Sequence, residues 1–241
     1  MAAARPQRPT RSLAFRRFLA VTIVFTFLYA GVLALSRLSY FRVQVVDVVG
    51  NSHETAGQVI AMSGLDDHPP MLTINGGKVS DAIAELRWVS HVTVSRHWPH
   101  RVTLMVHERT PVAVAPDSLG VLHLVDGDGH QLDPATVGVN LPHLAAVGSA
   151  DSWVYDRWAR PAAKVARQLP TTFAAHVRTV SVDAKGRVTL HFTTPVTFYL
   201  GRIERLHAKF VAISSVLAER TLAPNSYIDV SVPTAVTVEV R

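Results

Sequence analysis

A run of eighteen residues, Phe18 to Leu35, limits the structures open to this chain more than any other segment, because it has no charge, proline or strongly polar group. As a helix it would measure about 27 Å, close to the hydrocarbon thickness of a bilayer. Only a helix satisfies every backbone donor and acceptor in that setting. The run predicts a transmembrane helix over 18–38, after a cytoplasmic basic tail over 1–17.

Charge is distributed unevenly along the chain. The first 42 residues hold seven arginines and no acid, whereas residues 43–241 hold 17 basic and 18 acidic residues. The positive-inside rule therefore places the N-terminus in the cytoplasm and the chain from about Arg42 onward outside it. The net charge of +6 belongs to the N-terminal segment, so it does not indicate a nucleic-acid-binding body.

Two other interpretations of the apolar run stay open. Ala34-Leu35-Ser36 fits a signal-peptidase pattern, and cleavage there would release a secreted binding module. The run is longer than the apolar region of about 7–15 residues in signal peptides, which favours an uncleaved anchor. A buried helix of a soluble protein is less favoured, because such helices usually keep a polar stripe.

From residue 41 the pattern changes to strands and short helices, in the order strand, helix, helix, strand, strand. This order predicts two helices on a three-stranded sheet over 41–109. The expected elements are a strand at 41–49, a helix at 54–62 capped by Ser52 and ended by Gly64, an extended piece at 71–74, a helix at 79–86, and strands at 88–98 and 102–106. Trp98 is expected to pack against the sheet.

A second domain is predicted over 110–241, giving an α+β protein whose second sheet is mostly antiparallel. Asp126-Gly127-Asp128-Gly129 is interpreted as a hairpin turn, since no glutamate closes a calcium loop there. Residues 138–152 are weakly patterned and predict a loop. The clearest amphipathic helix is expected at 203–220, with Ile203, Leu206, Phe210, Ile213 and Leu217 on its apolar face. The other expected elements are a helix within 153–169 and strands at 176–182, 187–193, 196–200, 227–232 and 235–240.

Catalytic and cofactor-binding patterns are missing from the sequence. There is no cysteine, which excludes thiolate metal sites and cysteine nucleophiles. Gly76-Gly77-Lys78 lacks the earlier glycine and the following hydroxyl of a phosphate loop. Four histidines, at 91, 97, 100 and 107, gather around one hairpin, but they lack a metal-binding spacing. We therefore expect no enzyme activity, no cofactor and no metal.

Three segments resemble a known family. The block Trp88–Ala113, WVSHVTVSRHWPHRVTLMVHERTPVA, resembles the hallmark of the FtsQ/DivIB cell-division family. FRVQVVDVVGNSHETAGQVIAMSGL, from Phe41, resembles the opening of that family's POTRA domain, and Tyr227-Ile228-Asp229-Val230 resembles the motif after its last helix. The order of basic tail, single span, POTRA domain and β domain also agrees.

The resemblance implies a non-enzymatic divisome scaffold in the bacterial plasma (inner) membrane, concentrated at the division septum. It implies binding of FtsB/DivIC and FtsL, and an indirect link to FtsW and FtsI, the septal peptidoglycan synthase pair. It also implies that a partner strand adds to the open edge of the C-terminal sheet. The partner-binding residues expected here are Ser231, Val232, Thr234, Ala235, Val236, Thr237, Val238 and Val240. Arg202, Arg205 and Arg220 are expected to meet acidic partner residues.

Other classes of protein fit less well. A POTRA-bearing export or envelope-assembly component would carry a long C-terminal barrel, whereas about 130 residues with a strong amphipathic helix follow Pro111. An exported enzyme would need a convergent nucleophile, base or metal set. The simplest alternative for 235–240 is a terminal strand that binds no partner.

Overall fold

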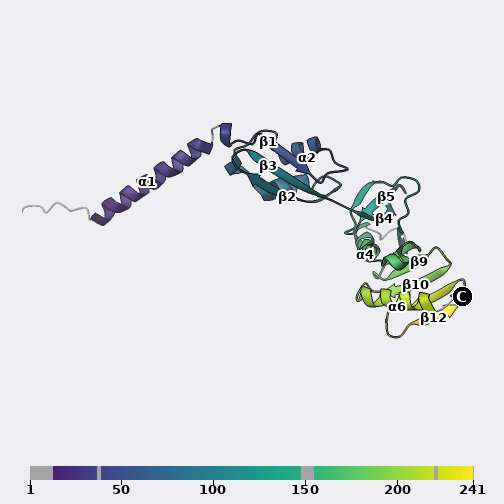
Figure 1. The fold of residues 1–241 in the computed structure, drawn as a ribbon. Coiled ribbons are helices and arrows are strands. Elements are labelled where there is room, and N and C mark those ends of the chain that lie inside the picture. Colours follow the sequence, from purple (N-terminus) through teal and green to yellow (C-terminus); the bar gives the residue numbers. More distant parts are fainter. Residues whose placement is uncertain (1–12, 37–38, 148–154, 220–221, 241) are drawn as a thin grey trace, which may run out of the picture. The chain divides into compact units, whose positions relative to one another are not determined.

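The computed structural model describes residues 13–36, 39–147, 155–219 and 222–240, and the chain divides into two compact units, 1–108 and 109–241 (Figure 1). Helix α1, Leu13–Ser36, begins earlier than the predicted helix at 18–38, whose last two residues lie outside the described part. The described part of the chain includes no helix that is both long and apolar enough to cross a membrane.

The first unit is a three-stranded sheet with two helices. Strand β3 lies in the centre, parallel to β1 and antiparallel to β2. Alternate residues of β3, at Val102, Leu104 and Val106, are buried under the helices, as the sequence predicts. The elements are β1 (Val45–Val49), α2 (Ala56–Ser63), α3 (Gly76–Ile83), β2 (Val89–His97) and β3 (Arg101–Glu108), with short 3-10 helices η1 (Ser39–Phe41) and η2 (Met71–Thr73).

Capping residues explain where the two helices begin and end. Thr55, rather than the predicted Ser52, caps α2, because its side chain and that of Gln58 form a reciprocal capping box. Gly64 ends α2 in the left-handed conformation, as predicted. Helix α3 begins three residues before its predicted start, because the Asn75 side chain accepts the N–H groups of Gly77 and Lys78. The segment predicted as extended at 71–74 is mostly the 3-10 turn η2.

The two tryptophans of the hallmark block have opposite environments. Trp88 is buried, and its ring stacks on His53 with 3.7 Å between ring centroids. Trp98, by contrast, is 52% exposed, so the prediction that it packs against the sheet is wrong. It lies one residue beyond the end of β2, in the turn to β3, past the last residue pair of the two strands, His97 opposite Arg101.

Glu108 ties the end of β3 to the loop before α2. Its carboxylate accepts hydrogen bonds from the backbone N–H groups of Ser52 and His53 and lies 2.7 Å from His53 Nδ1. Burial raises the pKa of Glu108, but the hydrogen bonds from His53 and the neighbouring backbone outweigh it and lower the pKa to about 2. The glutamate of the hallmark block therefore stabilises the first unit.

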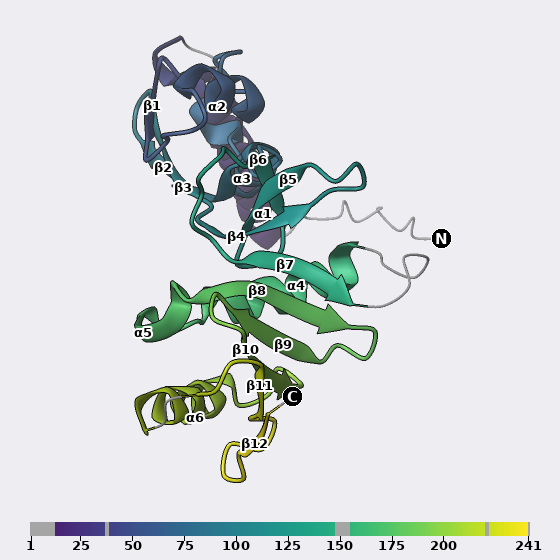
Figure 2. The same ribbon diagram turned by 90° about the vertical axis from the view of Figure 1, so that its right-hand side faces the viewer.

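The second unit is a nine-stranded sheet in the order β12-β11-β10-β9-β8-β7-β4-β5-β6 (Figure 2). Pairs β4–β7, β7–β8 and β10–β11 are parallel and the other five are antiparallel, so the sheet is mixed. The strands are β4 (Pro111–Pro116), β5 (Leu122–Asp126), β6 (Gln131–Pro134), β7 (His143–Val147), β8 (Val177–Asp183), β9 (Val188–Phe192), β10 (Val196–Gly201), β11 (Ser226–Asp229) and β12 (Thr237–Val240). The helices are α4 (Tyr155–Arg167), α5 (Thr171–Ala174) and α6 (Leu206–Glu219).

Strand β7 overturns the prediction of a loop at 138–152. It lies inside the sheet and pairs with β4 and β8, although only Leu144 among its five residues is buried. With alanines at 145 and 146 the strand lacks the alternation that identifies strands in a sequence. Residues 148–154, part of the same predicted loop, lie outside the described residues.

The predicted hairpin turn at 126–129 is confirmed and stabilised by a buried carboxylate. Asp126 accepts the backbone N–H groups of Asp128 and His130 at 2.9 and 2.8 Å, and Arg109 donates to its second oxygen at 2.7 Å. Both side chains of the Asp126–Arg109 pair are largely buried. The neighbouring residues Glu108 and Arg109 thus belong to different units. Glu108 binds the loop before α2 in the first unit, and Arg109 binds Asp126 in the second.

Candidate partner-binding edge

Strand β12 forms one edge of the nine-stranded sheet. It pairs with β11 along one side, from Thr237 opposite Asp229 to Val240 opposite Ser226, and all four of its residues are exposed. An edge strand presents backbone N–H and C=O groups that can pair with another strand. The edge is therefore a candidate site for a protein partner.

The register of β10, β11 and β12 shows which backbone groups point outward. Val230 donates its N–H to the Tyr199 carbonyl of β10, so alternate residues of β11, including Ile228, direct their backbone groups to β10. Tyr227 and Asp229 consequently face β12 and pair with Glu239 and Thr237. Val238 and Val240 then direct their N–H and C=O groups away from the sheet, toward any incoming strand.

A groove of about 410 Å³ runs beside this edge, between β12 and helix α6. Helix α6 buries Leu206, Phe210 and Ile213 against the sheet, as the helical spacing predicts. Leu217, predicted on the same face, is 38% exposed, because the buried face of the helix ends one turn earlier. Small and apolar side chains line the groove, among them Val211, Ala212, Val216, Pro233, Val236 and Val238.

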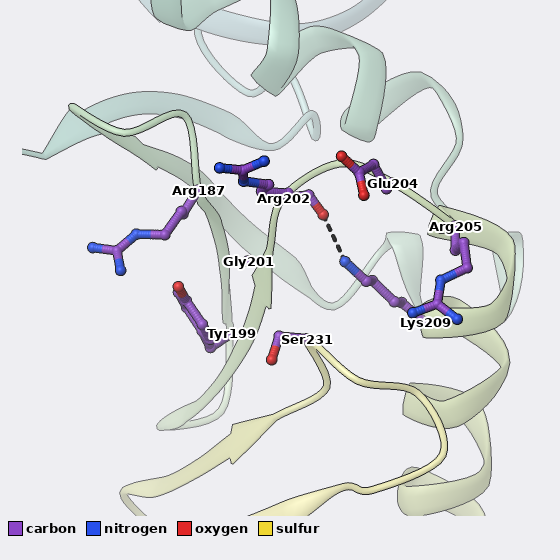
Figure 3. A pocket seen from close by; sticks show the side chains of 8 residues that line it. All are labelled: Arg187, Tyr199, Gly201, Arg202, Glu204, Arg205, Lys209 and Ser231. Carbon is purple, nitrogen blue, oxygen red and sulfur yellow. Dashed lines mark hydrogen bonds between the residues drawn. The ribbon is translucent and has the colours of Figure 1, made fainter.

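A second, smaller pocket of about 270 Å³ lies at the C-terminal end of β10 (Figure 3). Four basic residues line it, Arg187, Arg202, Arg205 and Lys209, against one acid, Glu204. Arg187 is engaged by Asp183 at 2.6 Å and lies over the Tyr199 ring, 5.9 Å from its centroid. The surplus of positive charge suits this pocket to a carboxylate side chain.

Lys209 is the buried member of the pocket, with 3% of its surface exposed. Its ammonium donates to the carbonyls of Leu200 and Arg202, at 2.7 and 2.6 Å, and burial lowers its pKa (Figure 3). The lysine thereby joins α6 to the end of β10. Gly201, with φ +66°, lets β10 pass close to Ser231, since a Cβ on it would lie 3.1 Å from the Ser231 Cβ.

The predicted partner-binding residues fall into two places, strand β12 and the segment before it. Thr237, Val238 and Val240 lie in β12, whereas the strand predicted at 235–240 begins only at Thr237. The other five lie between β11 and β12, where the N–H of Ala235 donates to the Val232 carbonyl at 3.0 Å. Within that segment Thr234 and Val236 line the groove and Ser231 lines the basic pocket.

Sequence reasoning located part of the basic pocket and missed the rest. Arg202 and Arg205 line it, although they precede α6 instead of lying on it, and their contact with an acidic partner stays a prediction. Arg220 lies outside the described residues. Lys209 and Arg187 were missed; Lys209 carried a signal, because it lies on the face defined by Leu206, Phe210 and Ile213. No group of three or more metal-ligating side chains comes together among the described residues.

The protein thus has two domains: a three-stranded sheet with two helices, and a mixed sheet that ends in an exposed edge strand. Comparison with known proteins identifies both domains. A family model described as POTRA domain, FtsQ-type, matches residues 41–109. A second model, described as Cell division protein FtsQ/DivIB, C-terminal, matches residues 113–231. The chain belongs to the FtsQ/DivIB family of bacterial cell division proteins, which confirms the family indicated by its sequence.

Similar proteins extend over nearly the whole chain. One named Cell division protein FtsQ, from Streptomyces venezuelae, is 33% identical over 95% of this chain and 88% of its own length. A protein of the same name from Streptomyces bingchenggensis is 30% identical over 91% of this chain and 85% of its own length. A third, from Mycolicibacterium smegmatis, is 26% identical over 86% of this chain and 61% of its own length.

Proposed function

We propose that the protein is a non-enzymatic, membrane-anchored scaffold of the divisome that binds FtsB/DivIC and FtsL through the β12 edge. The observation that carries the proposal is the outward direction of the backbone groups of Val238 and Val240 beside an apolar groove. A partner strand paired with β12 would gain backbone hydrogen bonds there, and its alternate side chains would enter the groove between β12 and α6. An acidic residue next to that strand would meet the pocket of Arg187, Arg202, Arg205 and Lys209.

The indirect link to FtsW and FtsI would run through those partners. A scaffold of this kind needs only to hold its partners at the membrane surface, where confinement raises their effective concentration. The family membership supports a role in cell division. The sequence supports the anchor, because eighteen uncharged residues follow Arg16 and Arg17. The described side chains of α1 support it too, since Phe18 and Phe27 are 70% and 76% exposed and none of those described belongs to either core. The arginine-rich N-terminus would then be cytoplasmic and both units would lie outside, concentrated at the septum.

Deleting residues 18–35 tests the anchoring role. We expect the shortened protein to stay folded, because neither hydrophobic core includes a described side chain of α1, and to fail to support division in cells that depend on it. Membrane fractionation should find it outside the membrane pellet, while circular dichroism shows the two units still folded and only the helical signal of α1 lost. A matched control replaces the deleted segment with an unrelated apolar helix of equal length, which should restore division. Full division activity without any span would contradict the anchoring role.

A further inference from the structure

The chain enters the POTRA unit at one particular end of its sheet. Because β1 runs parallel to β3, the start of β1 lies beside the turn between β2 and β3. Val45 pairs with Arg101, and the N–H of Gln44 donates to the His100 carbonyl at 2.9 Å. Tyr40 is only four residues beyond Ser36, the last residue of α1, and four residues span at most about 14 Å. This end of the sheet is therefore close to the end of α1 along the chain.

Aromatic side chains gather at this end and remain exposed. Tyr40 contacts Phe41 and His100, with ring centroids 5.3 and 5.9 Å apart, and Phe41 contacts Trp98 at 6.5 Å. We call these four residues the aromatic end cluster. Tyr40 and Trp98 are 58% and 52% exposed, although both belong to residue types that usually bury much of their surface. Two exposed amphipathic rings, both in contact with Phe41, indicate a surface that binds another molecule or a membrane.

The charged residues near the cluster indicate which kind of partner could bind it. Arg42 is held by the protein, since its Nε donates to the His68 carbonyl at 2.7 Å. Arg101 pairs with Asp47 at 2.8 Å. Arg96, two residues before Trp98, donates to the Ile74 carbonyl at 3.3 Å. Asp66 and Asp67 are exposed in the loop before His68, and with Asp47 they balance the three arginines among the described residues at this end of the unit. Such a surface does not suit an acidic protein segment. Exposed Tyr and Trp rings are the side chains that favour the headgroup region of a bilayer.

We propose that the aromatic end cluster inserts into the lipid headgroup region of the membrane that α1 enters, and so holds the POTRA unit by its β2–β3 turn against the bilayer. This inference rests on the proposed anchoring role of α1. The cluster adds a second, shallow attachment a few residues after the first, which restricts the orientation of the unit at the membrane surface. Ser52, beside Glu108 at the other end of β3, would lie in water.

Spin labelling of the full chain tests this placement, because the protein has no cysteine to compete for the label. Two variants each gain one exposed cysteine: His97→Cys, next to the intact cluster, and Ser52→Cys, at the other end of the sheet. Each is labelled with a nitroxide and incorporated into phosphatidylcholine vesicles. Collision of the label with a water-soluble nickel chelate is then compared with its collision with oxygen. Nickel collisions at residue 97 should be at least about threefold fewer than at residue 52, because headgroups exclude the chelate.

A third variant, His97→Cys with Trp98→Ser, should raise nickel collisions at residue 97 toward the value at residue 52. Equal nickel collisions at 97 and 52 in protein that floats with the vesicles would overturn the inference and leave the anchoring role intact. Protein that does not float with the vesicles would overturn the anchoring role and the placement of the cluster with it.

Discussion

Replacing Val238 with proline is expected to weaken binding of the FtsB/DivIC-type partner by roughly 10- to 100-fold, the effect of losing one buried interstrand hydrogen bond. The N–H of Val238 points away from β11, so proline removes a donor available to the partner and none from the β11–β12 ladder. Proline is tolerated in an edge strand at such a position. Isothermal titration calorimetry of residues 43–241 with the partner's soluble domain measures the change.

Two matched variants separate the contribution of the backbone N–H to binding from that of the side chain. Val238→Thr keeps the N–H and the branched shape, and should bind within a few-fold of the unchanged protein. Glu239→Pro removes a donor that faces β11, and should detach β12 and abolish binding altogether. If Val238→Pro binds as tightly as Val238→Thr while both remain folded, the partner does not pair with this edge.

Replacing Asp126 with asparagine is expected to destabilise the second unit by about 3–5 kcal/mol, the usual cost of breaking a buried ion pair. Arg109 would keep its buried charge without its carboxylate, and the asparagine amide would direct N–H groups toward a guanidinium that only donates. Thermal unfolding followed by circular dichroism measures the loss. The control is Asp128→Asn in the same turn, where the ion pair with Arg167 is exposed and the loss should stay below about 1 kcal/mol.

The pH dependence of the stability of Asp126→Asn provides a second test of the same carboxylate. Burial raises the pKa of Asp126, but hydrogen bonds from Arg109 and from two backbone N–H groups outweigh it, and the pKa is lowered. The stabilisation is therefore complete above the unfolded-state pKa of about 3.9 and is lost as the pH falls below it. Asp126→Asn should show a weaker acid destabilisation of the second unit than the unchanged protein does. Identical acid unfolding of the two proteins would contradict the role given to this carboxylate.

The sequence predicts much of this fold because alternation and helical spacing are direct consequences of burial on one face. Val102, Leu104 and Val106 alternate in the sequence and are buried together in β3. Leu206, Phe210 and Ile213 recur at helical spacing and are buried in α6. Strand β7 escaped prediction because its place inside the sheet comes from pairing with β4 and β8, which lie far from it along the chain.

The candidate site was harder to predict for a related reason. The sequence indicates a strand at 235–240, but which of its N–H groups point outward depends on the register among β10, β11 and β12. The basic pocket likewise joins Arg187 before β9 to Lys209 in α6, two residues with no sequence relation. Trp98 was predicted wrongly for a different reason. Its apolar character is evident from the sequence, but its position beyond the end of β2 is not.

Amide hydrogen exchange of residues 43–241, measured by NMR with and without the FtsB/DivIC-type soluble domain, tests the edge-strand account most directly. In the free protein Thr237 and Glu239 should exchange more slowly than Val238 and Val240, because only the first two donate to β11. On binding, the amides of Val238 and Val240 should become protected, as donors to a newly paired strand. A partner that binds tightly while these two amides keep exchanging at their free rates would contradict the account.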